Sequence, residues 1–264
     1  MSDAVESMEN EPQQRDLVGS LAKGLGVLEI LAGAPAGLRL TEVAEAAGLT
    51  RAGARRLLLT LVSEGYARQE GRQFLLSAKL LSLGRTWLGG GSIWSLAEPI
   101  LRETSQAVGE SCSAAVLEGE DVVYVARVAG RRIVSVSLSV GTRLPAYCTS
   151  MGRVLLSGLN DAELARFLRK ASIRANTPKT MTDRQALAAC VADIRRAGYA
   201  IVDEELEMGL RSIAAPVRSR TGAVVAAVNI STQSARFSCG EMREILLPPL
   251  LEAAAKIENL LAFQ

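Results

Sequence analysis

Residues 41–63 read TEVAEAAGLTRAGARRLLLTLVS, and this stretch decides the fold of the first part of the chain. Thr41 is the expected N-cap of a short helix over 42–47, because its hydroxyl can accept a hydrogen bond from the first helical turn. Thr50 is the expected N-cap of a second helix, over 51–63. Only three residues, one of them a glycine, separate the two helices. Two helices joined by so tight a turn are typical of a helix-turn-helix.

The segments on either side extend this motif. Upstream, the spacing of apolar residues predicts a helix over 20–32. The expected buried stripe of that helix consists of Leu21, Leu25 and Leu28. Downstream, residues 66–76 predict two short strands about a glycine turn. Three helices followed by a strand pair are the element order of a winged helix-turn-helix.

One face of the expected 51–63 helix is basic. At helical spacing one apolar face is formed by Ala54, Leu57, Leu58 and Leu61, and the opposite face carries three arginines. Three arginines alone also fit a solvated helix face, but the surrounding architecture favours a surface that reads duplex DNA. Arginine pairs with guanine bases or with backbone phosphates. The predicted DNA-contacting residues are Thr50, Arg51, Ala52, Arg55 and Arg56.

The chain is long enough, at 264 residues, for two domains. Residues 1–16 contain five acids and one arginine, which predicts a disordered acidic leader. The expected DNA-binding domain covers 17–76. A linker helix and a hinge of three glycines are expected over 77–91, and a larger domain over 92–264.

Strands and helices alternate irregularly in the larger domain. Expected helices cover 93–108, 149–157, 161–169, 182–197 and 239–262. Expected strands cover 114–118, 122–127, 133–140, 199–202, 213–218 and 223–230. Thr182 and Gln185 have the spacing of a capping box. This order predicts an α+β domain, with an antiparallel sheet backed by helices.

Composition excludes several classes of protein. The chain has no histidine, which argues against a zinc enzyme and a histidine-dependent catalytic triad. Its four cysteines are far apart and are expected as free thiols. The polar start and the lack of a long apolar run predict a cytoplasmic protein with no membrane partner. No residue is assigned as catalytic, as a metal ligand or as a cofactor ligand.

Four segments together resemble the IclR family of bacterial regulators, over residues 17–262. They are Ser20–Glu29, Thr50–Leu61, Gly141–Leu156 and Asp203–Val217. The forms TRAGARR and LPAYCTSMGR are similar to those of regulators of protocatechuate and 4-hydroxybenzoate catabolism. The chain departs from this pattern at Gly53, where alanine is usual.

The resemblance implies a winged helix-turn-helix joined by a linker helix to a GAF-like α+β effector-binding domain. It also implies a small-molecule site between the sheet and the region of residues 144–151. The residues carried over by motif are Val136, Leu144, Ser150, Met151, Asp203, Leu210, Ser212, Asn229 and Ser231. Apolar walls with a few polar groups suit a small ligand.

A carboxylate ligand would also need positive charge or free backbone N–H groups. Arg143 or Arg211 is expected to add charge, and a helix capped by Thr149 can offer its N-terminal amides. Tyr147 is expected either to stack on an aromatic ligand or simply to pack.

These observations predict a transcription regulator, not an enzyme, that binds double-stranded operator DNA. The expected effector is a small aromatic carboxylate such as protocatechuate or a hydroxybenzoate, and the expected targets are aromatic catabolic genes. A keto acid or a sugar acid is the alternative effector. Two other classes remain open: an enzyme with an accessory DNA-binding domain, and an architectural module without ligand. Pairing of half-sites predicts a dimer, and the resemblance suggests a tetramer.

Overall fold

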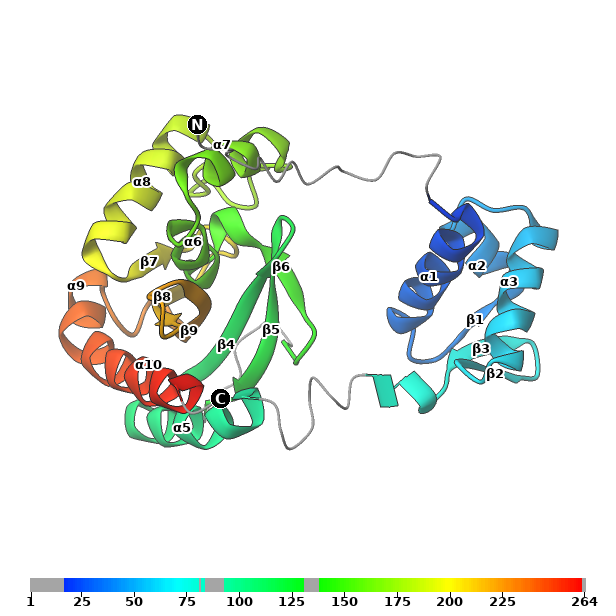
Figure 1. Ribbon diagram of the computed structural model, residues 1–264, viewed down its shortest axis with the longest axis horizontal. Helices are drawn as coiled ribbons and strands as arrows, with labels where there is room; N and C mark the ends of the chain where they lie inside the picture. Colours follow the sequence, from blue (N-terminus) through cyan, green and yellow to red (C-terminus); the bar gives the residue numbers. More distant parts are fainter. Residues whose placement is uncertain (1–16, 81, 84–92, 131–137, 263–264) are drawn as a thin grey trace, which may run out of the picture. The chain divides into compact units, whose positions relative to one another are not determined.

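The chain divides into two compact units, Met1–Thr86 and Trp87–Gln264 (Figure 1). The computed structural model describes residues 17–80, 82–83, 93–130 and 138–262. The expected acidic leader, the three hinge glycines and Val136 lie outside the described residues. Of the expected linker helix, residues 79–80 and 82–83 are helical, and the part from residue 84 onward is not described.

The N-terminal unit is a winged helix-turn-helix. Its elements are α1 (Gly19–Ala32), β1 (Leu38–Arg39), α2 (Leu40–Ala46), α3 (Arg51–Ser63), β2 (Ala67–Glu70) and β3 (Gln73–Leu76). The strands form an antiparallel sheet in the order β1-β3-β2. Val27, Val43, Leu58 and Phe74 are buried in its core, so one residue from each helix and one from the wing hold the unit together.

The expected buried stripe of α1 is wrong. Leu21 and Leu25 are 61% and 52% exposed, whereas Val27 and Leu31 are buried. The buried face includes Gly24, where an added Cβ would lie 3.9 Å from the Leu57 Cδ2 atom of α3. Helix α1 therefore packs against α3 along the face that includes Gly24, Val27 and Leu31. The spacing of the leucines alone did not indicate which face of α1 is buried.

Helix α2 begins earlier than expected. Leu40 is its first residue, Arg39 is at the N-cap position, and Thr41 lies inside the helix. The backbone N–H of Arg39 donates to the Glu42 carboxylate at 2.6 Å. Strand β1 runs directly into α2, so Thr41 lies inside the first turn of the helix and cannot be its N-cap.

The C-terminal unit has an antiparallel sheet in the order β6-β5-β4-β9-β8-β7. Its strands are β4 (Ser111–Glu118), β5 (Asp121–Val128), β6 (Arg143–Pro145), β7 (Ala200–Asp203), β8 (Leu210–Arg218) and β9 (Val224–Gln233). Its helices are α5 (Ile93–Val108), α6 (Ser150–Ser157), α7 (Asp161–Lys170), α8 (Arg184–Ala197), α9 (Cys239–Glu241) and α10 (Leu247–Ala262). The α+β class is therefore as expected.

A layer of helices covers each face of this sheet (Figure 1). Helices α5 and α10 pack on one face, against large side chains such as Ile213, Val228 and Ile230. Helix α6, with α7 and α8 behind it, packs on the other face, where Ala214 and Ala227 are buried. Neighbouring strand residues face opposite layers because side chains alternate along a strand. Small side chains on the second face allow α6 to lie close to the sheet.

The end of one expected strand and one expected helix cap in this unit are wrong. Residues 138–140, the described part of the expected 133–140 strand, are not a strand, and β6 forms the sheet edge instead. Helix α8 is capped by Asp183, which accepts from the Ala186 N–H at 2.7 Å, so Thr182 opens no capping box.

The last helix is not continuous. Residues Met242–Leu246 form a π-helical segment between α9 and α10. Pro248 and Pro249, which lack a backbone N–H, lie in the first turn of α10. They cannot make the i to i−4 hydrogen bonds that would continue a regular helix, which accounts for the change in winding. None of the helices in the described part of the chain is long and apolar enough to cross a membrane.

Gly152 makes the closest approach in the C-terminal unit. A Cβ atom there would lie 2.1 Å from the Ala146 carbonyl oxygen, in the segment before α6. We expect Gly152→Ala to lower the free energy of unfolding of this unit by roughly 3 kcal/mol or more, because backbone must move to make room. Urea unfolding of the full chain measures the change.

Gly240→Ala is the matched control. An added Cβ at Gly240, in α9, meets nothing closer than the Ser238 Oγ atom at 3.8 Å. The control should change the free energy of unfolding by less than about 1 kcal/mol. Equal stabilities of the two variants would show that α6 does not depend on this contact.

Candidate functional site

The outward face of α3 is basic and open to solvent. The Thr50 hydroxyl caps the helix by accepting from the Gly53 N–H at 3.1 Å. Arg51, Ala52, Arg55 and Arg56 are exposed, while the opposite side of the helix is buried. Among the described residues no carboxylate pairs with these three guanidinium groups. The face is therefore free to bind an anionic partner.

A groove adjoins this face and adds two arginines that the sequence reasoning missed. It is lined by Arg39, Leu40, Thr41, Arg55, Leu59, Gln69, Arg72 and Phe74. Arg39 precedes α2, and Arg72 lies in the turn between β2 and β3. Arg72 could have been found from the sequence, because it follows the glycine of the expected hairpin turn. The groove brings α2, α3 and the wing together on one positively charged surface.

A cavity lies between α6 and the sheet of the C-terminal unit. It is lined by Tyr124, Arg127, Leu138, Cys148, Thr149, Ser150, Met151, Val202, Leu206, Leu210, Ser212, Asn229 and Ser231. The empty space is about 550 Å³ including its mouth, but the centre of a water-sized molecule can occupy only about 30 Å³ of it. A ring-shaped ligand therefore enters only if wall side chains change rotamer. Arg127, Leu206 and Leu210 are half-buried and have that freedom.

Strand register brings the polar wall residues together. Asn229 of β9 pairs with Ser113 of β4, which pairs with Arg127 of β5. One step along the same face, Ser231 of β9 pairs with Ser212 of β8. Directly opposed side chains in antiparallel strands lie about 5 Å apart. Residues far apart in the sequence thus form one polar patch on the sheet.

Two buried polar atoms at the cavity, the Ser150 hydroxyl and the Asn229 carbonyl oxygen, have no hydrogen-bond partner among the described residues. Their side chains are almost fully buried, at 1% and 3% exposure. The Asn229 amide nitrogen donates to the Ser231 hydroxyl at 2.9 Å, which leaves the oxygen directed elsewhere. An unsatisfied buried polar group costs roughly 1–3 kcal/mol. Such a cost is relieved when a polar ligand or water binds there.

The first turn of α6 adds positive potential to this wall. Thr149 caps the helix and accepts from the Gly152 N–H at 3.2 Å. The first N–H groups of a helix have no partner within the helix, and the helix dipole favours an anion beside them. The helix terminus and the Ser150 hydroxyl together can hold a carboxylate.

Four of the predicted effector residues do not line the cavity, namely Arg143, Leu144, Tyr147 and Asp203. Leu144 packs in the core behind it, and the Tyr147 hydroxyl donates to the Arg174 carbonyl at 2.7 Å. The structure does bring together Ser150, Met151, Leu210, Ser212, Asn229 and Ser231. The register of two strands, β8 and β9, and the position of one helix terminus decide this set.

Neither arginine expected to supply charge reaches the cavity. Arg143 lies at the surface and pairs with Glu118 at 2.6 Å, a contact that raises the pKa of Arg143. Arg211 pairs with Asp203 at 2.7 Å. Arg127 is the cation in the wall, and its guanidinium lies 3.4 Å from the Ser113 hydroxyl. In the sequence, Arg127 stands out as the one charged residue of the apolar run 122–128.

Burial decides the chemistry of two other wall residues. It raises the pKa of the Cys148 thiol to about 11 and that of Tyr124 to about 12. Both groups therefore stay protonated at neutral pH. Cys148 acts as a small apolar wall and not as a nucleophile, because only the thiolate is reactive.

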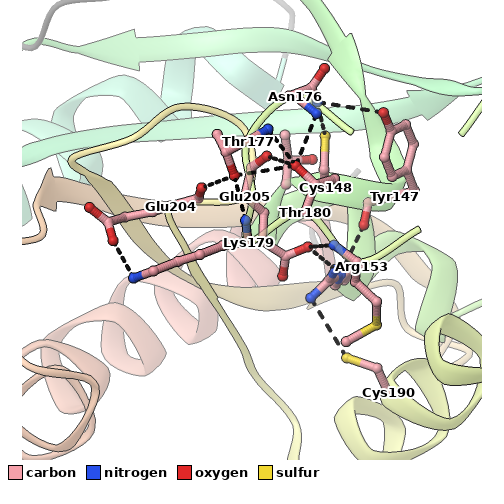
Figure 2. Close-up of polar contacts among 12 residues, drawn as sticks. Tyr147, Cys148, Arg153, Asn176, Thr177, Lys179, Thr180, Cys190, Glu204 and Glu205 are labelled. Carbon is pink, nitrogen blue, oxygen red and sulfur yellow. Dashed lines mark hydrogen bonds and ion pairs between the residues drawn. The ribbon is translucent and has the colours of Figure 1, made fainter. Parts of the chain in front are cut away.

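The turn after β7, residues 204–209, carries Leu206 on the cavity wall. Glu204 has a left-handed backbone, with φ of 56°, which a residue other than glycine seldom adopts. Its carboxylate accepts from the Gly209 N–H at 2.7 Å and the Ser234 hydroxyl at 2.9 Å, and it pairs with Lys179 (Figure 2). These contacts lower the pKa of Glu204 to about 2, and the contact with Lys179 makes the largest contribution.

The sequence and the structure are both similar to known regulators. Residues 20–71 match the family model of the IclR helix-turn-helix domain, and residues 86–259 match that of the bacterial transcriptional regulator IclR C-terminal domain. The Pca regulon regulatory protein of Pseudomonas putida is 41% identical over 240 residues, which cover 90% of this chain and 82% of that protein.

Two further similarities concern hydroxybenzoate. The p-hydroxybenzoate hydroxylase transcriptional activator of Acinetobacter baylyi is 32% identical over 255 residues, which cover 95% of this chain and 94% of that protein. The crystal structure of an IclR homologue from Microbacterium hydrocarbonoxydans, complexed with 4-hydroxybenzoate, has a TM-score of 0.80 and 28% identity. The match covers 92% of this chain and 98% of that one.

The depressed pKa of Glu204 predicts a pH-dependent stability. A carboxylate whose pKa falls from 4.5 to about 2 on folding stabilises the folded state above pH 4.5, and that stabilisation is lost as the pH falls towards 2. We expect Glu204→Gln to be less stable than the natural chain at pH 6, and the gap to close between pH 4.5 and 2. Urea midpoints in a pH series measure it, and a constant gap would refute the assignment.

Proposed function

The chain belongs to the IclR family of bacterial transcriptional regulators, and we propose that a small aromatic acid, bound in the cavity beside α6, controls its binding to operator DNA. It is a DNA-binding transcriptional regulator, with its winged helix-turn-helix in the N-terminal unit. A regulator of bacterial operators acts in the cytoplasm, where the DNA is. The proposed targets are genes of aromatic catabolism.

One observation carries the effector proposal: the Ser150 hydroxyl and the Asn229 carbonyl oxygen are buried at the cavity, and neither has a hydrogen-bond partner in the part of the chain that the structure describes. A hydroxyl on a ligand ring can donate to Asn229. A carboxylate can accept from Ser150 and lie either at the α6 N-terminus or beside Arg127. Tyr124, Met151 and Leu206 offer apolar surface to the ring between them.

The similarities to other proteins support an aromatic ligand. Two of them concern hydroxybenzoate, through a transcriptional activator and a complexed structure. A keto acid or a sugar acid is the alternative. It would leave the apolar walls in contact with a polar ligand, which is unfavourable because buried apolar surface is best covered by apolar atoms.

We also propose that the protein acts as a dimer or as a tetramer. One recognition helix reads only a few base pairs, and symmetric regulators gain specificity by pairing half-sites. Leu17, Leu21 and Leu25 are each more than half exposed at helical spacing on α1 and just before it. An exposed apolar stripe of this kind supports burial against a second copy.

Removal of an α3 arginine tests the DNA surface. We expect Arg51→Ala and Arg55→Ala each to weaken operator binding by about 1–3 kcal/mol, because each loses a base or phosphate contact. Affinities for the operator and for random duplex, measured at one salt concentration, separate the two kinds of contact. Arg102→Ala, on the exposed side of α5, is the control and should bind normally. Unchanged affinity in both α3 variants would place the interface elsewhere.

Calorimetry with the full chain tests the effector. Protocatechuate or 4-hydroxybenzoate should bind at one site per chain, and Ser212→Leu should abolish binding because its side chain fills the cavity. Operator binding without effector should persist in this variant. Arg127→Met should weaken the acid at least tenfold, and the control Arg143→Met should not, because Arg143 lies outside the cavity. Binding of a keto or sugar acid, with no heat from any hydroxybenzoate, would reject the aromatic assignment.

A further inference from the structure

A buried ion pair lies directly behind two walls of the cavity. The Arg153 Nη2 atom of α6 is 2.6 Å from the Glu205 Oε2 atom in the turn after β7. The two side chains are 3% and 9% exposed. Within the described residues, no other ion pair has both partners so deeply buried. Neither residue lines the cavity.

Arg153 connects three parts of the fold through one guanidinium group (Figure 2). Its Nε atom donates to the Tyr147 carbonyl at 2.9 Å, in the segment that leads into α6. Its Nη1 atom lies 3.8 Å from the Cys190 sulfur of α8. Its Nη2 atom pairs with Glu205. The start of α6 is thus fastened both to α8 and to the turn.

Glu205 fastens the same turn to a second segment, residues 176–181. Its carboxylate also accepts from the Met181 N–H at 2.8 Å, and its carbonyl accepts from the Thr180 hydroxyl at 2.6 Å. The Glu204 carbonyl accepts from the Thr177 hydroxyl at 2.6 Å (Figure 2). These hydrogen bonds restrain the turn against residues 176–181.

The residues next to the ion pair are the ones that line the cavity. Ser150 lies one helical turn before Arg153, and Leu206 follows Glu205 directly. A buried ion pair is weak evidence for stability, because removing both charges from water costs about as much as their attraction returns. Its position behind both walls therefore suggests a role in the geometry of the site.

We propose that Arg153 and Glu205 are positioning residues for effector recognition. The ion pair sets the distance between the α6 wall, at Ser150 and Met151, and the wall formed by Leu206 and Leu210. It thereby fixes the size of ligand that the cavity accepts. The inference rests on the proposed function of the cavity as an effector site.

The test compares variants of the full chain. Glu205→Gln keeps an acceptor for the Met181 N–H but removes the charge that holds Arg153. Arg153→Lys keeps the charge but cannot donate to Tyr147, Cys190 and Glu205 together. Glu110→Gln is the matched control, since Glu110 is also buried, at 6% side-chain exposure, and paired with Arg236, yet neither residue lines the cavity.

Three measurements are needed: calorimetry with the hydroxybenzoate that the natural chain binds, thermal unfolding, and amide hydrogen exchange over residues 204–210. We expect Glu205→Gln to weaken the acid at least tenfold and to speed exchange in the turn at least tenfold. Arg153→Lys should weaken binding by a smaller factor. Glu110→Gln should lower the unfolding temperature to a similar extent but change the effector affinity less than twofold.

The results separate the two proposals. If the natural chain binds no acid, the proposed effector site fails, and exchange in the turn alone decides the role of the ion pair. Equal effector affinity in Glu205→Gln and the natural chain would overturn the inference, as would an equal loss in Glu110→Gln. Unchanged exchange over 204–210 would overturn it too. If Glu205→Gln does not fold, the same comparisons are made with Arg153→Lys.

Discussion

The C-terminal unit depends on the burial of α6 against an alanine-lined face of the sheet. All eight residues of this helix are buried, including its serines and Arg153. The helix can lie there because Gly152 has no side chain and because Ala214 and Ala227 are small. The buried polar groups of this helix then need hydrogen-bond partners, because an unsatisfied polar group away from bulk water is costly. Arg153 has such partners, whereas the Ser150 hydroxyl has none within the described residues.

This arrangement explains why the cavity lies at the N-terminal end of α6. The helix terminus, an unpartnered hydroxyl and the Asn229 amide converge there, and the surrounding walls are apolar. Segments far apart in the sequence meet at this point: α6, the strands β5, β7, β8 and β9, and the turn after β7. A cavity assembled in this way responds to any change in how those segments pack.

In the N-terminal unit, opposite faces of the single helix α3 serve packing and DNA recognition. Ala54 and Leu58 of α3 face the core, and the arginines face solvent on the opposite side. Both roles follow from the period of one helix. The wing and the start of α2 then extend the basic surface with Arg39 and Arg72.

The sequence by itself determined the element order, the helix-turn-helix with its arginine face, the α+β class and six of the cavity residues. Local rules suffice for the elements and the arginine face, because capping, periodicity and turn residues act within a few positions. The six cavity residues were instead implied by the resemblance of sequence motifs to the IclR family. It did not determine which face of α1 is buried, where α2 begins or which arginine enters the cavity. Those depend on the packing of α1 against α3, on β1 running into α2, and on the pairing of Arg127 with Ser113 and of Ser113 with Asn229 across three strands. Only the tertiary structure decided them, since strand register brings side chains together that no local pattern relates.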